Sequence, residues 1–156
     1  MAEFNTRGIN ASQIFFAERL PRAKYLSRYR IADLFLDASP YNAGTTASDA
    51  LWAGLPVLTF LGATFSARMG GSLLKAVGLP ELICNCQKEY EDLAIALGLN
   101  QSRCTEIKAI LAANRSNTPL FDINTFTRNL ELGLMTAHQG RINEMPLDYI
   151  IINSHE

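Results

Sequence analysis

The sequence has few cysteines, few histidines and no long apolar run, and each shortage excludes a class of protein. Its three cysteines are an odd number, and Cys84 and Cys86 are one residue apart, which is not the C-x-x-C spacing of redox and zinc motifs. We therefore expect reduced thiols and a cytoplasmic protein. No apolar run approaches the roughly 18 residues that a membrane-spanning helix needs, so no membrane partner is expected.

Basic charge is not in excess. Fourteen Lys and Arg residues stand against fifteen Asp and Glu residues, which gives a formal net charge of -1. Domains that bind nucleic acid usually carry a basic surplus, so we predict no nucleic-acid partner. The sequence also lacks the G-x-x-x-x-G-K-[ST], G-x-G-x-x-G and H-E-x-x-H motifs. It therefore does not indicate a P-loop protein, a classical dinucleotide-binding protein or a zinc protease.

What is present is a chain of 156 residues, 48% of them hydrophobic, which is enough for one domain with its own core. Short apolar runs predict strands at 13–17, 33–39, 56–60 and 81–84. Helical periodicity predicts helices at 19–32, 46–53, 66–77, 89–97, 103–114 and 124–138. Strands that alternate with helices favour an α/β fold with a parallel sheet and right-handed crossovers.

The predicted organisation is one incomplete domain with short flanking segments. We expect residues 1–8 to be disordered or introduced by cloning, residues 9–139 to form a partial Rossmann-like domain, and residues 140–156 to form a tail. In that tail, "LDYIII" is predicted as a strand or a packing segment. A doubly wound domain usually has about six strands, so four predicted strands indicate the later part of such a domain.

The stretch "NAGTTASDALWAGLPVLTF", residues 42–60, contains the candidate site. In an open parallel sheet, the loop after a strand and the start of the next helix form the ligand edge. A helix start offers unpaired N–H groups and about half a unit of positive charge. Thr45 and Thr46 can add hydroxyl hydrogen bonds to phosphate, and Gly44 lets the backbone approach a ligand. Asp49 can accept hydrogen bonds from ribose hydroxyls.

A second interpretation of the same residues needs no ligand. Thr46-Ala-Ser-Asp49 fits a capping box, in which Thr46 caps the helix and Asp49 reaches back to its first N–H groups. Such a cap is worth about 1 kcal/mol. A capped helix start and a phosphate site are both compatible with this pattern.

Arginines near this stretch can add an anion contact. Arg68 lies in the helix after "LGATFS", and a basic stretch precedes the second strand at Arg22, Lys24, Arg28 and Arg30. Alternatively, Arg68 and this basic stretch are solvent-exposed residues on helix surfaces and bind no ligand.

Three blocks carry a family resemblance: "RIADLFLDASPYNAGTTASDALWAGLPVLTF", "EYEDLAIALG" and "TPLFDINTFTRNLE". In this order they resemble the C-terminal part of the O-linked N-acetylglucosamine transferase family, including its Spindly-type members, from about Ile9 to Gly133. The resemblance implies a GT-B glycosyltransferase whose C-terminal Rossmann-like domain binds UDP-N-acetylglucosamine, or GDP-fucose in some Spindly-type members. Such enzymes transfer the sugar to Ser or Thr of proteins with inversion, and no metal or other cofactor is expected.

The resemblance also implies roles for single residues. Thr45 and Thr46 correspond to threonines that bind the diphosphate, and Asp49 corresponds to an aspartate that binds the ribose hydroxyls. Arg28 matches an arginine near the nucleotide. Arg68 matches a family arginine without an assigned role.

Two positions depart from the family pattern. The histidine that usually precedes the two threonines is Gly44 here, and a second histidine, which lies against uracil, corresponds to Tyr25. Tyr25 can still stack on a base, but the choice between UDP and GDP stays open.

The resemblance leaves out the N-terminal Rossmann domain and the helical repeats that bind acceptor proteins. With them go the acid–base residues and a lysine that contacts the diphosphate, so we expect this chain alone to bind UDP or UDP-N-acetylglucosamine without transferring the sugar. Its partners in a complete enzyme would be those missing parts and the acceptor proteins. The alternative is a non-catalytic interaction module whose incomplete sheet pairs with another copy, giving a homo-oligomer.

Overall fold

The computed structural model describes residue 4 and residues 6–152. Its sheet has three parallel strands in the order β1-β2-β3, with bounds β1 Phe35–Leu36, β2 Val57–Phe60 and β3 Ile83–Cys84. In the register, Phe35 pairs with Val57, and Thr59 pairs with Ile83. The central strand β2 is buried along most of its length, as expected for a continuous apolar run covered on both faces. The predicted α/β fold with a parallel sheet is confirmed.

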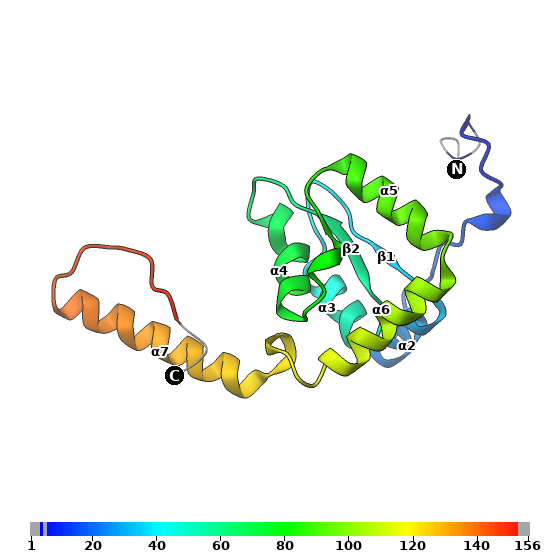
Figure 1. Cartoon of the computed structure of the whole chain (residues 1–156). Helices are drawn as coiled ribbons and strands as arrows, with labels where there is room; N and C mark the ends of the chain where they lie inside the picture. The colour runs from blue at the N-terminus through cyan, green and yellow to red at the C-terminus, as the bar shows by residue number, and fades with distance from the viewer. Residues whose placement is uncertain (1–3, 5, 153–156) are drawn as a thin grey trace.

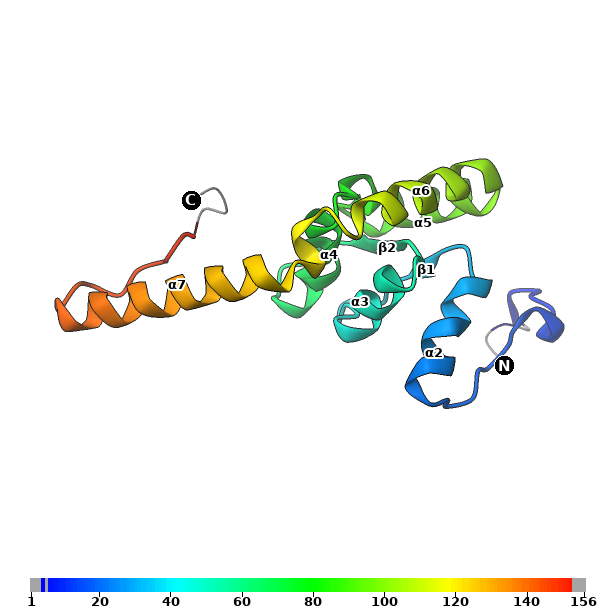
Figure 2. The same cartoon turned by 90° about the horizontal axis from the view of Figure 1, so that it is seen from below.

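Helices cover both faces of this sheet. The α-helices are α2 Arg22–Arg28, α3 Thr45–Trp52, α4 Met69–Ala76, α5 Gln87–Gly98, α6 Gln101–Asn114 and α7 Ile123–Ile142. Short 3-10 turns are η1 Ala11–Gln13, η2 Tyr29–Ile31, η3 Ser66–Arg68, η4 Pro80–Leu82 and η5 Pro119–Phe121. Helices α3 and α4 lie on one face of the sheet, and α5 and α6 lie on the other (Figures 1 and 2).

Local sequence signals explain where several helices begin and end. Gly54 follows α3 with φ 89° and Gly78 follows α4 with φ 74°, a left-handed conformation that glycine adopts without strain. The Asn100 side chain accepts a hydrogen bond from the Arg103 amide at the start of α6. Asp122 does the same at the start of α7, through the amide of Thr125.

The hydrophobic core lies between the sheet and its helices. It contains Leu51 of α3, Leu58 of β2, Leu74 of α4 and Leu111 of α6, all fully buried. The buried thiols of Cys84 and Cys104 border this core, and all three cysteines are free, as predicted. Burial, and then the nearby charge of Glu89, raises the pKa of Cys84.

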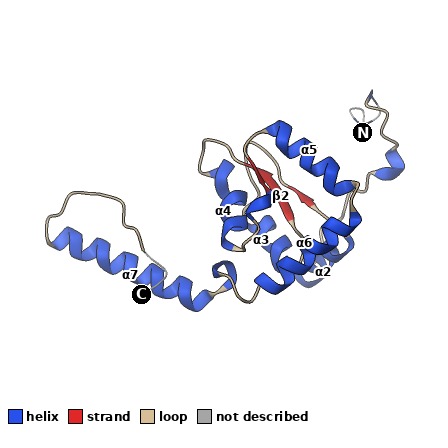
Figure 3. Cartoon of the chain, in the orientation of Figure 1, coloured by secondary structure: helices blue, strands red, loops and turns tan. Residues whose placement is uncertain are grey.

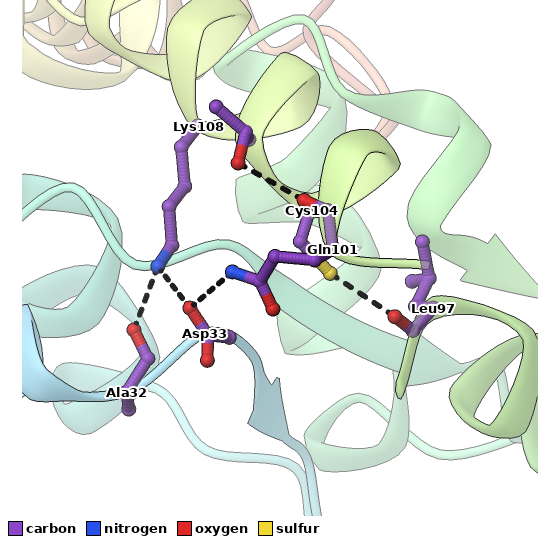
Figure 4. A network of polar contacts seen from close by, with 7 residues as sticks. Ala32, Asp33, Leu97, Gln101, Cys104 and Lys108 are labelled. Atoms are coloured by element: carbon purple, nitrogen blue, oxygen red, sulfur yellow. Dashed lines mark hydrogen bonds and ion pairs between the residues drawn. The ribbon is translucent and has the colours of Figure 1, made fainter. Parts of the chain in front are cut away.

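A polar network joins α6 to the segment before β1 (Figure 4). The Lys108 ammonium donates to the Ala32 carbonyl at 2.9 Å and to Asp33 Oδ1 at 2.7 Å. The Gln101 amide donates to the same Asp33 oxygen at 3.3 Å. The hydrogen bond from Lys108 is the largest cause of the lowered pKa of Asp33, followed by the one from Gln101. These contacts position the chain where it enters β1.

The predicted strand at residues 13–17 is wrong. The chain there forms the turn η1 and then an irregular segment, with Phe15 and Phe16 87% and 76% exposed (Figure 3). A strand requires a neighbouring backbone to satisfy its N–H and C=O groups, and no such neighbour lies beside this segment among the described residues. The apolar run alone was therefore an insufficient signal.

The C-terminal part extends away from the sheet. Helix α7 projects from η5 and contacts the domain mainly there, and the chain after it turns back along the helix (Figures 1 and 2). A Cβ placed on Gly133 would lie 3.8 Å from the Ile152 side chain. Residues 147–152 form no strand, and the side chains of Leu147, Tyr149 and Ile151 are almost fully exposed, so neither alternative for "LDYIII" is confirmed. Within the described residues, no helix combines the length and the apolar character that crossing a membrane requires.

Candidate functional site

The candidate site lies where β1 ends and α3 begins. Helix α3 starts at Thr45, with Gly44 as its N-cap and no side-chain hydrogen bond to the cap. The first backbone bond of the helix runs from the Ser48 amide to the Gly44 carbonyl. The amides of Thr45, Thr46 and Ala47 donate to no atom of the described part of the chain. The helix start is therefore left with unpaired donors.

The predicted capping box does not form. Because α3 begins one residue earlier than expected, Thr46 is its second residue and its side chain cannot cap the helix. Asp49 makes no hydrogen bond back to the first turn, and instead its Oδ1 lies 3.5 Å from the Arg22 guanidinium. The hydroxyls of Thr45 and Thr46 lie on an exposed surface beside the unpaired amides.

The loop before α3 is held by a buried carboxylate that the sequence analysis missed. Asp37, only 5% exposed, accepts hydrogen bonds on Oδ1 from the amides of Ala38 at 2.8 Å and Ala43 at 2.7 Å. Its Oδ2 accepts from the Thr59 hydroxyl of β2 at 2.7 Å. One side chain thus fixes both ends of the loop against the sheet. The available signal was a carboxylate that closes an apolar strand.

Asn42 fixes the same loop from its other side. Its amide group donates to the Ala38 carbonyl at 2.9 Å, and its backbone N–H donates to the Ser66 carbonyl at 3.1 Å. The second bond joins the loop to η3, at the entrance to α4. Together with Asp37, this contact sets the position of the α3 start relative to α4.

Tyr25 reaches α3 indirectly. Its hydroxyl makes a short hydrogen bond with the Tyr29 hydroxyl, and Tyr29 donates to the Thr46 carbonyl at 3.3 Å. Burial, and next the hydrogen bond with Tyr25, raises the pKa of Tyr29 well above its ordinary value. A tyrosine phenol is protonated at neutral pH even at its ordinary pKa, so Tyr29 can act as a donor. Tyr25 is thus brought beside the site.

Arg28 makes its side-chain hydrogen bond away from the helix start. Its guanidinium donates to the Glu18 carbonyl at 2.6 Å, ten residues earlier. Arg22 is the member of the basic stretch that faces α3, through its contact with Asp49. Both arginines lie in one basic stretch of the sequence, and the helical turn of α2 separates their side chains.

Gly44 has room for a side chain. A Cβ built there would lie 3.6 Å from the Met69 side chain, an ordinary contact, and its φ is -94°. Close backbone packing within the chain is therefore not what requires glycine at this position.

Taken together, the α3 start can bind an anion. Unpaired amides, the positive end of the helix dipole, two exposed hydroxyls and a nearby guanidinium meet at one edge of the sheet. Asp49 adds an acceptor whose side chain is 17% exposed. Among the described residues, no group of three or more His, Cys, Asp or Glu side chains is placed to hold a metal ion.

The profile of glycosyl transferase family 41 matches residues 1–130. The chain belongs to this family. It is 36% identical, over 80% of its length, to a probable UDP-N-acetylglucosamine–peptide N-acetylglucosaminyltransferase SEC of Arabidopsis thaliana. It is 30% identical, over 95% of its length, to the UDP-N-acetylglucosamine–peptide N-acetylglucosaminyltransferase of Caenorhabditis elegans.

A solved structure agrees with this assignment. A mutant of the Thermobaculum terrenum O-GlcNAc transferase superposes with a TM-score of 0.77 at 33% identity, covering 83% of this chain and 25% of that one. The predicted family and the predicted fold, a partial Rossmann-like sheet of a GT-B glycosyltransferase, are thus confirmed. The chain spans only 13% of the length of the Arabidopsis and Caenorhabditis relatives.

Proposed function

We propose that this chain is the donor-binding part of a protein O-linked N-acetylglucosamine transferase, and that the α3 start binds the diphosphate of a UDP-sugar. The observation that carries the proposal is the uncapped helix start with its exposed Thr45 and Thr46. In a family 41 chain, such a start at the carboxyl edge of the sheet has the donors that a diphosphate needs.

Each neighbour of the helix start has a proposed task. The first-turn amides and the hydroxyls of Thr45 and Thr46 bind the phosphate oxygens, and Asp49 accepts hydrogen bonds from the ribose hydroxyls. Arg22 holds Asp49 in place and adds positive charge. In a complete enzyme, these donors would stabilise the charge that develops on the leaving diphosphate without a required metal.

Transfer itself needs groups that these residues do not provide. The α3 start binds and orients an anion. We assign neither an acid–base pair nor acceptor-binding repeats to these 156 residues. We therefore expect donor binding without turnover when this chain is tested alone. The acceptor would be Ser or Thr of a protein.

Calorimetric titration with UDP and GDP tests donor binding. We expect saturable UDP binding that weakens by about tenfold or more in the Thr46→Ala, Asp49→Ala double variant, since lost hydrogen bonds to charged groups cost about 1.5–3 kcal/mol each. A Thr136→Ala, Asp148→Ala variant is the matched control, because both positions lie on or after α7 and are exposed. Folded protein that binds neither nucleotide would refute the proposal.

One observation favours a second candidate function, a non-catalytic interaction module. Among the described strands, β1 pairs only with β2, and its other edge is open. Leu36 of β1 is 57% exposed, and Ile31, four residues before β1, is also exposed. Such an edge favours pairing with another chain. Light scattering behind size-exclusion chromatography would show oligomers if this candidate is right and a monomer if it is wrong.

A further inference from the structure

The outward face of α4 is basic. Arg68 ends η3 and is the N-cap of α4, while Ser72 and Lys75 lie within α4. The three residues are spaced four and three positions apart, which places them on one side of this continuous helical stretch. All three are exposed, and we call them the basic face of α4. With the apolar side chains of Leu61 and Phe65, they line a pocket of about 400 Å³. The pocket therefore has an apolar wall and a cationic side.

The two cations of this face have no acidic partner. Neither Arg68 nor Lys75 forms an ion pair or a side-chain hydrogen bond with any described residue, and residues 61–80 contain no Asp or Glu. Elsewhere, the cations of Lys88 and Lys108 lie within ion-pair distance of a carboxylate. The unbalanced charge of the basic face of α4 favours an anionic ligand.

The pocket adjoins the candidate donor site. Met69 lines the pocket, and its Cγ lies 3.6 Å from where a Cβ on Gly44 would be. The Asn42 amide donates to the Ser66 carbonyl and so ties the loop before α3 to the entrance of α4. A ligand in this pocket would thus lie next to the α3 start, at the same edge of the sheet.

The spacing of the charges indicates what kind of anion fits. Lys75 lies seven positions after Arg68, which corresponds to about 10.5 Å along a helix axis. A ligand that contacts both cations, with each side chain extended outwards, must itself extend over a similar length. In a polyproline II segment, residues three apart lie on the same side and are about 9 Å apart. Two carboxylates in that arrangement would match the two cations, while the residues between them contact Phe65 and Leu61.

We propose that the basic face of α4 binds an acidic, extended segment of the polypeptide acceptor, with carboxylates three residues apart. Assignment of this segment to the acceptor rests on the proposed function, while binding of the segment does not. Arg68 and Lys75 bind the two carboxylates, and Ser72 donates to the backbone between them. The acceptor hydroxyl is then held beside the donor diphosphate.

Fluorescence anisotropy with two labelled peptides tests this proposal on the 156-residue chain. One peptide contains Glu-Pro-Pro-Glu, and the other contains Glu-Glu-Pro-Pro, which has the same charge with the wrong spacing. We expect the first to bind more tightly, and its binding to be lost at about 1 M salt, where the Debye length is about 3 Å. Equal affinity for the two peptides, or no binding of the first, would overturn the proposal.

Variants separate the basic face from general charge. Arg68→Gln with Lys75→Gln should weaken binding of the Glu-Pro-Pro-Glu peptide by about fivefold or more. Lys24→Gln with Arg141→Gln removes the same charges from exposed positions outside the pocket, and should change the affinity by less than about twofold. Equal weakening by both pairs would contradict a specific site. Circular dichroism confirms that the variants are folded.

A UDP titration of the same variants distinguishes this proposal from the donor site. Of the two substitutions, Lys75→Gln should leave UDP affinity unchanged, because Lys75 lies near the C-terminal end of α4 and the donor contacts come from α3. If the chain binds the peptide but not UDP, the donor proposal fails and the basic face of α4 stands as a peptide site. If it binds UDP but not the peptide, the peptide proposal fails and the donor proposal stands.

Discussion

Replacing Thr59 by valine should destabilise the domain more than its size suggests. Valine keeps the shape and the β-branch of threonine, so the packing of β2 is preserved. What is lost is the hydroxyl that donates to Asp37 Oδ2 at 2.7 Å. No other described group donates to this oxygen, so the variant leaves one side of a buried carboxylate without a partner.

The magnitude follows from the burial of both partners. Thr59 is 0% exposed and Asp37 is 5% exposed, so water cannot replace the lost hydroxyl without opening the structure. A hydrogen bond to a charged group contributes about 1.5–3 kcal/mol, and we expect Thr59→Val to lower the free energy of unfolding by that amount. For a domain of this size, the melting temperature should fall by roughly 3–12 °C.

Urea unfolding followed by circular dichroism measures this change. Thr136→Val is the matched control, because the Thr136 hydroxyl donates to the Leu132 carbonyl on the exposed surface of α7. We expect the control to stay within about 0.5 kcal/mol of the parent chain. If Thr59→Val is as stable as the control, the hydrogen bond from Thr59 to Asp37 does not stabilise the loop before α3.

Two further predictions follow from glycine packing and from the α6 network. Gly70→Ala should destabilise the domain by about 1–3 kcal/mol in urea unfolding, because its Cβ would lie 2.5 Å from Asp37 Oδ2; Gly98→Ala, with nothing within 4 Å, should be neutral or slightly stabilising. Lys108→Met should return the lowered pKa of Asp33 towards its ordinary value in a carboxyl NMR titration. The stabilisation from this pair is fully present above about pH 3.9, the pKa of Asp33 in the unfolded chain, and it is lost as the pH falls through the lowered pKa of the folded state. The variant lacks this stabilisation, so its free energy of unfolding should fall less in acid. If the pKa of Asp33 in Lys108→Met is the same as in the parent chain, the ion pair does not lower it.

The pattern of apolar residues predicted much of the fold, because the inner strands and helices bury the apolar faces that this pattern marks. The runs at 56–60 and 81–84 contain β2 and β3, and the helices over 89–97 and 103–114 lie within α5 and α6. Burial on both faces leaves a strand with a continuous apolar run, and burial on one face leaves a helix with an apolar stripe.

The failures occurred where structure depends on partners distant in the sequence. The run at residues 13–17 has strand composition but no neighbouring strand among the described residues. The helix after β1 begins one residue early because the Asp37 hydrogen bonds, one of them to Thr59 of β2, determine where the loop ends. A contact between residues 22 positions apart leaves no local pattern, so the sequence could not decide between a capping box and a helix start with unpaired amides.

The most direct test of the donor site is an amide NMR titration of the labelled chain with UDP and, separately, with uridine. We expect UDP to shift the amide signals of Thr45, Thr46 and Ala47 in a saturable way, while uridine, which lacks phosphate, leaves them nearly unchanged. If UDP leaves these three amide signals unchanged while the chain is folded, or shifts only signals from other elements, the α3 start is not the donor site.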